Sequence, residues 1–147
     1  TNLELLRKSV ATGKQVIFST GMSTQAEIDH AVEVLRIAKK DFNNEYPIGL
    51  LHCNSTYPAP VNELNLSGIK TLAEKYEDFI IGYSGHEYTL GTTVASVLLG
   101  AKTKFPLESL VTIFKLVNGI RELEQAYGDG VIQVTESEKP VREKLRG

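Results

Sequence analysis

Short apolar runs recur at a regular spacing along the chain, and a polar cluster follows each of them. The runs begin at Val16, Ile48 and Phe79, about 32 residues apart, which is a natural length for one strand with its crossover helix. Because the runs are continuously apolar, they are typical of strands buried on both faces of a parallel sheet. We therefore predict parallel strands over 16–20, 48–53 and 79–84.

Helical patterns occupy the segments between these runs. Thr24 and Glu27 form a capping-box pattern ahead of an apolar stripe that recurs every three or four residues. Similar apolar stripes follow the runs that begin at Ile48 and Phe79. Gly128 follows the last stripe, and glycine is typical of the position just after a helix C-terminus. We predict helices over 25–40, 64–76, 89–100 and 108–127.

This order of strands and helices predicts an α/β fold and excludes all-α and all-β folds. An open doubly wound sheet places its ligand at one switch point, whereas a TIM barrel gathers the carboxyl ends of all strands. All three runs end in clusters that contain Gly or Ser, which favours the barrel. A complete barrel takes about 250 residues. The chain has 147, so we predict a partial TIM (β/α)8 barrel, roughly its C-terminal half.

Composition excludes several classes of protein. Hydrophobic residues make up 41% and charged residues 23%, which is typical of a globular domain and not of a disordered chain or coiled coil. The net charge of -2 argues against a nucleic-acid partner. The single cysteine, Cys53, excludes a disulfide framework and fits a cytoplasmic location. No apolar run approaches the roughly 20 residues that span a bilayer, so we predict no membrane partner.

The first two polar clusters each allow a functional and a structural interpretation. Residues 19–24 could receive an anion at a helix start, or they could form a capping turn only. In the cluster 52–60, a cysteine beside a histidine could supply a nucleophile. Alternatively Cys53 is a small buried residue, and on an extended strand His52 points away from it.

The third cluster, residues 82–87, contains His86 next to Glu87. A histidine at a strand end could be a metal ligand or a general base. A single histidine is a weak indication of a metal site, because such a site needs several ligands. Both a functional and a structural role stay open from the residues alone.

Taken together, the stretches 12–22, 51–58, 65–66, 81–87 and 99–102 carry a resemblance to a known family. In this order and spacing they resemble the N-acetylneuraminate (sialic acid) synthase family, which includes synthases of related nonulosonic acids. The resemblance runs from residue 1 to about residue 102 and resumes weakly over 107–128.

The resemblance implies a TIM-barrel transferase that joins phosphoenolpyruvate to an N-acetylated hexosamine aldehyde such as N-acetylmannosamine. A divalent metal, Mn²⁺ or Mg²⁺, polarises the aldehyde as a Lewis acid. C3 of phosphoenolpyruvate attacks the aldehyde, water adds at C2, and phosphate leaves. Such enzymes are homodimers, so the resemblance also implies a homodimer.

The same resemblance assigns roles to residues at matching positions. It implies that His86 is a catalytic residue and one of two metal-binding histidines, and that Ser55 and Ser84 contact phosphate or carboxylate groups. It also implies that Tyr57 contacts the sugar substrate. Gly85 stands where many members have Asp, and Gly-His-Glu is the other version of this motif.

The chain departs from the family after Lys102. The family continues into a last barrel strand with a Glu-x-His pattern, whereas here no histidine follows His86, and about twenty residues are absent by comparison. The upstream strands and a small C-terminal antifreeze-like domain are absent as well. We therefore predict a partial synthase barrel domain over 1–130, with its last strand missing, and a linker or tail towards the absent domain over 131–147. The chain alone should be inactive.

Two other functions stay open. The chain could be a non-catalytic α/β module that binds phosphate, or part of another phosphoenolpyruvate or aldolase-type barrel. An aldolase needs a Schiff-base lysine at the carboxyl end of a strand. Lys14 and Lys102 do not end a predicted strand, which counts against an aldolase.

Overall fold

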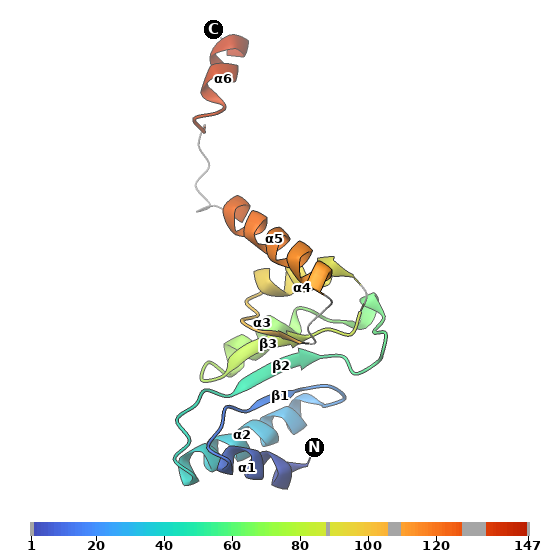
Figure 1. The fold of residues 1–147 in the computed structure, drawn as a ribbon, viewed down its shortest axis with the longest axis vertical. Helices are drawn as coiled ribbons and strands as arrows, with labels where there is room; N and C mark the ends of the chain where they lie inside the picture. Colours follow the sequence, from blue (N-terminus) through green and yellow to red (C-terminus); the bar gives the residue numbers. More distant parts are fainter. Residues whose placement is uncertain (1, 88, 106–109, 128–134, 147) are drawn as a thin grey trace.

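The centre of the molecule is a four-stranded parallel sheet in the order β1-β2-β3-β4 (Figure 1). A computed structural model describes residues 2–87, 89–105, 110–127 and 135–146. The strands are β1 (Ile17–Ser19), β2 (Gly49–Cys53), β3 (Ile80–Ser84) and β4 (Lys104–Phe105). The prediction of three neighbouring parallel strands is confirmed.

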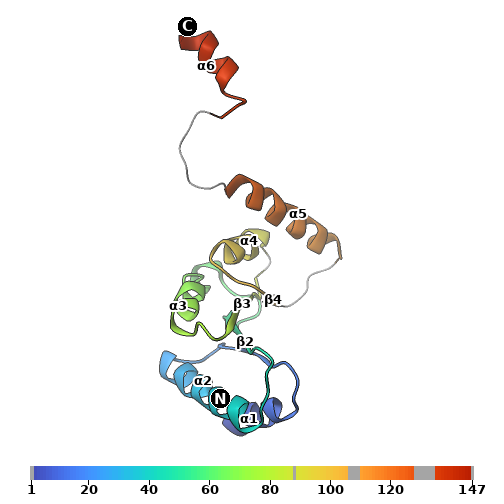
Figure 2. The ribbon, with the colours of Figure 1, turned by 90° about the vertical axis from the view of Figure 1, so that its left-hand side faces the viewer.

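Helices connect the strands and extend the chain beyond them. They are α1 (Leu3–Ala11), α2 (Gln25–Asp41), a short 3₁₀ turn η1 (Val61–Glu63), α3 (Gly68–Lys75), α4 (Leu90–Leu98), α5 (Leu110–Tyr127) and α6 (Lys139–Arg146). Figure 2 shows α2, α3 and α4 following one another along one side of the strands. Within the described parts of the chain, none of these helices is long and apolar enough to cross a membrane.

The hydrophobic core lies between one face of the sheet and these helices. Leu50 and Tyr83 from the sheet are fully buried, together with Leu35 of α2 and Ile69 of α3. Because side chains alternate along a strand, the opposite face carries the other set of residues. On that face Ile17 is 47% exposed. The helices therefore pack on the face that carries Leu50 and Tyr83, as helices do in the wall of a barrel.

A short fourth strand, β4, follows β3 in a segment for which no strand was predicted. That the last strand of the barrel is missing stays a prediction. The amide of Lys102 donates to Ile81 at 2.8 Å, and the amide of Tyr83 donates to Thr103 at 2.8 Å. These bonds align the backbone so that β4 pairs in parallel with β3. Backbone pairing needs no apolar run, and the sequence Lys-Thr-Lys gives none.

The third helix begins later than predicted. The pattern suggested 64–76, but α3 starts at Gly68 and is preceded by η1. Asn65 lies between them with φ of +46°, which is the left-handed conformation that a helix cannot continue through. Asn adopts this conformation more readily than most residues do.

Two helices occur in segments for which no helix was predicted. Helix α1 begins after Asn2, whose side chain accepts a hydrogen bond from the amide of Leu5 at 3.0 Å. Helix α6 lies within the segment 131–147, and Figures 1 and 2 both place it away from the sheet. Helix α5 confirms the predicted fourth helix from residue 110 onward, and residues 108–109 and 131–134 lie outside the described residues. The division into a domain over 1–130 and a tail stays a prediction.

Candidate functional site

Polar loops follow β1, β2 and β3 at the carboxyl ends of these strands. We call this side of the sheet the carboxyl edge (residues 19–24, 52–60 and 84–87). The loops after β2 and β3 are joined there. The amide of Ala59 donates to the carbonyl oxygen of His86 at 3.1 Å. The rings of Tyr57 and His86 pack edge to face, with centroids 5.6 Å apart. The structure thus brings together two of the predicted site residues.

The two predicted serines lie along the same edge. Ser84 ends β3 and is buried, directly opposite Cys53 of β2 in the strand register. Ser55 is exposed and packs over the backbone of Gly21, because a Cβ built at that glycine would lie 2.0 Å from Ser55 Oγ. Neighbouring strands are about 4.8 Å apart, so these residues share one rim. Their roles in binding stay predictions.

A cavity of about 390 Å³ lies beside this rim, lined by Met22, His52, Cys53, Asn54, Ser55, Thr56, Glu63, Leu64 and Asn65. Its shape depends on Asn54, which sequence reasoning did not single out. The Asn54 side chain accepts a hydrogen bond from the amide of Thr56 at 2.9 Å and donates to the carbonyl oxygen of Glu63 at 3.3 Å. An Asn that bonds the backbone two residues later is typical of an Asx turn, which was the available indication.

The pairing of His52 with Cys53 does not form. The His52 Nε2 atom lies 2.8 Å from the carbonyl oxygen of Leu64, and the ring packs against Gly68 at the start of α3. Cys53 lies on the other face of β2, beside the loop that contains Gly21. The nucleophile hypothesis is therefore wrong for this pair, and His52 instead fastens the η1 segment to the sheet.

His86 is half-buried and lies at the carboxyl edge rather than among the core residues. Its Nδ1 atom is buried and has no hydrogen-bond partner. Within residues 2–87, 89–105, 110–127 and 135–146, no three His, Cys, Asp or Glu side chains are grouped so that they could hold a metal ion. One imidazole does not make a metal site, so these residues alone do not fit the metal that the resemblance implies.

Glu87, the neighbour of His86, points into the protein. Its carboxylate is buried and accepts hydrogen bonds from the hydroxyl of Tyr83, at 2.9 Å, and from the hydroxyl of Thr92. Burial, together with the Glu87 carboxylate, raises the pKa of Tyr83 well above its ordinary value. Glu87 therefore links the end of β3 to the first turn of α4.

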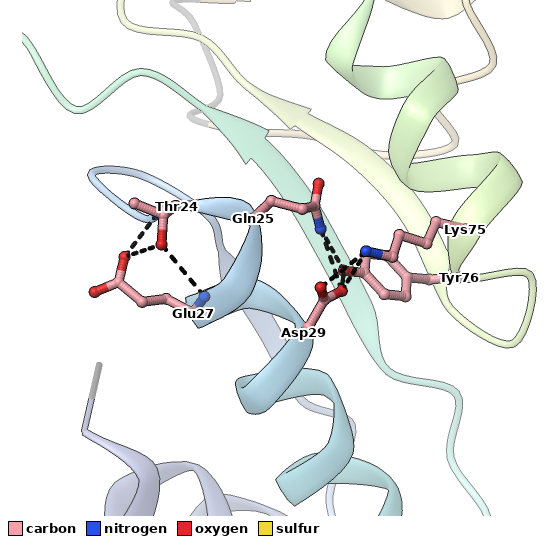
Figure 3. Close-up of polar contacts among 6 residues, drawn as sticks. All are labelled: Thr24, Gln25, Glu27, Asp29, Lys75 and Tyr76. Carbon is pink, nitrogen blue, oxygen red and sulfur yellow. Dashed lines mark hydrogen bonds and ion pairs between the residues drawn. The ribbon is translucent and has the colours of Figure 1, made fainter.

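The first polar cluster forms a capping turn, as one of its two interpretations predicted. Figure 3 shows the amide of Glu27 donating to Thr24 Oγ1 at 3.4 Å, while the Glu27 carboxylate accepts from the Thr24 amide at 2.7 Å. The backbone and side-chain hydrogen bonds from Thr24 lower the pKa of the Glu27 carboxyl group. Because this carboxylate already occupies the helix start, it disfavours an anion there.

A second polar network in Figure 3 joins α2 to the end of α3. Asp29 accepts from the ammonium of Lys75 and from the hydroxyl of Tyr76, and Gln25 donates to Tyr76 at 2.7 Å. The hydrogen bonds from Lys75 and then Tyr76 lower the pKa of Asp29. Burial, and then the hydrogen bond to Asp29, raise the pKa of Tyr76 to about 12. This network holds α2 against the end of α3.

Comparison with known proteins now adds to this geometry. A model of the NeuB family matches residues 1–105, which is well over half of the chain. The chain belongs to the NeuB family. This confirms the resemblance on which the site residues were assigned.

Several curated relatives of this NeuB chain are named as synthases of sialic acid or related acids. The N,N'-diacetyllegionaminic acid synthase of Campylobacter jejuni is 33% identical over 157 residues, which cover 95% of this chain and 45% of that protein. The human N-acetylneuraminate-9-phosphate synthase is 28% identical over 162 residues, which cover 98% of this chain and 43% of that protein. The chain thus spans less than half the length of these relatives.

A solved structure gives the same picture of the fold. The sialic acid synthetase of Leptospira borgpetersenii, in complex with citrate, matches with a TM-score of 0.72 and 29% identity. The match covers 99% of this chain and 55% of that one. The mixed α/β fold with a small parallel sheet is therefore similar to sialic acid synthase structures.

The human alignment also bears on the predicted internal gap. It extends over 162 residues, more than the 147 residues of this chain. The human protein therefore has residues within the aligned region that have no counterpart here. The absence of a single segment after Lys102 stays a prediction.

Proposed function

We propose that this chain contributes part of the catalytic barrel of a nonulosonic acid synthase. Such an enzyme joins phosphoenolpyruvate to an N-acetylated sugar aldehyde, such as N-acetylmannosamine, and releases phosphate. The observation that carries the proposal is the junction of the β2 and β3 loops at Ala59, Tyr57 and His86. Ligands of parallel α/β proteins bind at this edge, where the strands end.

The proposed roles follow from the chemistry of each group. Ser55 and Ser84 lie on one rim, where their hydroxyl groups can donate to the phosphate or carboxylate of phosphoenolpyruvate. The exposed ring of Tyr57 offers an apolar face and a polar tip to a sugar. C3 of phosphoenolpyruvate attacks the aldehyde carbon, water adds at C2, and phosphate departs.

His86 contributes one donor to the proposed site. Its buried Nδ1 has no hydrogen-bond partner, and the described part of the chain supplies no further grouped ligands. We propose that residues outside this chain complete the Mn²⁺ or Mg²⁺ site of the whole enzyme. Mn²⁺ alone should therefore bind weakly to this chain, because a hard cation held by one imidazole keeps mostly water ligands.

The partial barrel is also part of the proposal. Among the described residues, the sheet ends at β1 on one side and at β4 on the other. Closing a barrel removes open edges of this kind. We propose that the complete enzyme closes the barrel, acts in the cytoplasm and forms a homodimer.

A phosphate-binding module is the second candidate, because the described residues contain no group of potential metal ligands. NMR titrations with phosphoenolpyruvate and with inorganic phosphate distinguish a synthase site from a phosphate-binding module. A synthase site should bind phosphoenolpyruvate several-fold more tightly, since its carboxylate adds hydrogen bonds. Equal affinities would support the module, and no binding of either would count against both.

A third candidate, an aldolase, has its own test. Pyruvate and borohydride would trap a Schiff base as a covalent adduct detectable by mass spectrometry. The expected result is no adduct. An adduct at Lys14 or Lys102 would contradict the proposed function.

A further inference from the structure

We propose that Glu87 is a positioning residue, whose buried carboxylate directs the imidazole of His86 outward to Tyr57. The importance of this orientation rests on the proposed function, in which His86 acts at the carboxyl edge. The geometry itself depends on contacts within the chain and can be tested without substrate.

The carboxylate of Glu87 is fastened at both oxygens. One oxygen accepts a hydrogen bond at 2.9 Å from Tyr83, which is fully buried in β3. The other accepts from Thr92, in the first turn of α4. A carboxylate with two hydroxyl donors that come from different elements has little freedom to leave this place.

Gly85 allows the carboxylate to pack this closely. A Cβ built at Gly85 would lie 2.6 Å from Tyr83 Cε1 and 2.8 Å from Glu87 Oε2. A side chain at this position would therefore push Tyr83 or Glu87 out of place. Gly85, which precedes His86, is thus packed closely against the side chain of Glu87, which follows His86.

These anchors leave His86 on the outer side. Glu87 lies in a bend with its carboxylate held by Tyr83 and Thr92, whereas the ring of His86 contacts Tyr57 of the loop after β2. The carbonyl oxygen of His86 is held by the Ala59 amide at 3.1 Å, and its ring packs on Tyr57. Because the buried Nδ1 has no hydrogen-bond partner, no bond at that nitrogen orients the ring. The orientation therefore comes from the anchored backbone and from Tyr57.

NMR of the imidazole rings tests this directly, because the chain has only three histidines. In the unchanged protein, ring protons of Tyr57 and His86 should give nuclear Overhauser effects. In Glu87→Ala these effects should be lost and the His86 ring signals should shift, while the exposed His30 keeps its signals. Glu87→Gln should restore the contact, since the amide oxygen can accept from Thr92 and the amide N–H can donate to Tyr83.

Glu63→Ala is the matched control, because Glu63 is an exposed carboxylate at the same edge. It should leave the His86 signals unchanged. If Glu87→Ala also leaves the contact between Tyr57 and His86 unchanged, the proposal is overturned. If Glu87→Gln keeps the contact between Tyr57 and His86, the role of Glu87 does not depend on its charge alone. If Glu87→Gln loses this contact, the proposed positioning by hydrogen bonds is contradicted.

Thr92→Val decides the matter if Glu87→Ala unfolds the chain. The substitution removes the Thr92 hydroxyl, one of the two donors, at a half-buried position. It should weaken the ring contact without altering His30, and an unchanged contact would overturn the proposal. Failure to bind phosphoenolpyruvate would count against the proposed function and not against this inference, because the readout is a contact within the chain.

Discussion

The backbone amide of Ala59 donates a hydrogen bond to the carbonyl oxygen of His86, with 3.1 Å between nitrogen and oxygen. Twenty-seven positions separate the two residues in sequence, yet the bond joins loops that follow neighbouring strands. The Tyr57 and His86 rings pack beside it. The carboxyl edge is therefore one connected surface at this point and not a set of independent loops.

Hydrogen exchange tests this connection. Ala59 is buried, so its amide should exchange about tenfold more slowly than an exposed, unbonded loop amide of the same intrinsic rate. NMR-detected exchange of the whole chain measures this. An Ala59 amide that exchanges at the rate of an unstructured peptide would show that the two loops are not held together.

Acid should destabilise the chain through Asp29. Hydrogen bonds from Lys75 and Tyr76 lower its pKa below the ordinary 3.8, so the unfolded chain takes up the proton first. This contribution to stability is present above pH 3.8 and is lost as the pH falls through the folded pKa. Urea midpoints measured from pH 6 downward should therefore decrease below about pH 4. Asp29→Asn should flatten the decrease, and a midpoint that rises on acidification would contradict the account.

The tyrosines should show the opposite dependence at alkaline pH. The pKa of Tyr76 is raised to about 12, so its contribution to stability is complete below pH 10.0 and is lost as the pH rises through about 12. Tyr76 and Tyr83 should ionise above pH 10.0 in a spectroscopic titration of the folded chain, because burial and a carboxylate raise both pKa values. Tyr76→Phe should lower the free energy of unfolding by about 1 kcal/mol at neutral pH. Six tyrosines that titrate together near pH 10 would contradict this prediction.

The chain alone should have no measurable synthase activity. It spans less than half the length of the two curated relatives compared above, and within the described residues its sheet has four strands. An assay of phosphate release from phosphoenolpyruvate and N-acetylmannosamine with Mn²⁺ should stay at background. Turnover comparable with that of a complete synthase would refute the prediction.

Much of the fold could be predicted from the sequence because the strongest patterns are periodic. The apolar runs at Val16, Ile48 and Phe79 gave three strands in parallel, and the capping box at Thr24 gave the start of α2. These features are determined by burial of apolar side chains and by local backbone hydrogen bonds. Both can be recognised without knowledge of the tertiary structure.

The features that could not be predicted depend on contacts between distant segments. Strand β4 forms because the backbone of Lys102 and Thr103 pairs with β3, and no apolar pattern accompanies it. Helix α1 buries little beyond Val10, so its stripe is weak, although Asn2 was an available capping residue. The inward orientation of Glu87 requires donors from two other positions, which sequence spacing does not show.

The affinity of two serine variants for phosphoenolpyruvate tests the central claim most directly. Ser84 lies at the carboxyl edge, whereas Ser9 lies in α1 and donates to the carbonyl oxygen of Leu5. Ser84→Ala should weaken binding about tenfold, as expected for loss of one hydrogen bond to a charged group, and Ser9→Ala should leave it unchanged. NMR titration of both variants measures the affinities. Equal affinities in the unchanged chain and in Ser84→Ala, or shifts confined to residues away from the carboxyl edge, would contradict the account.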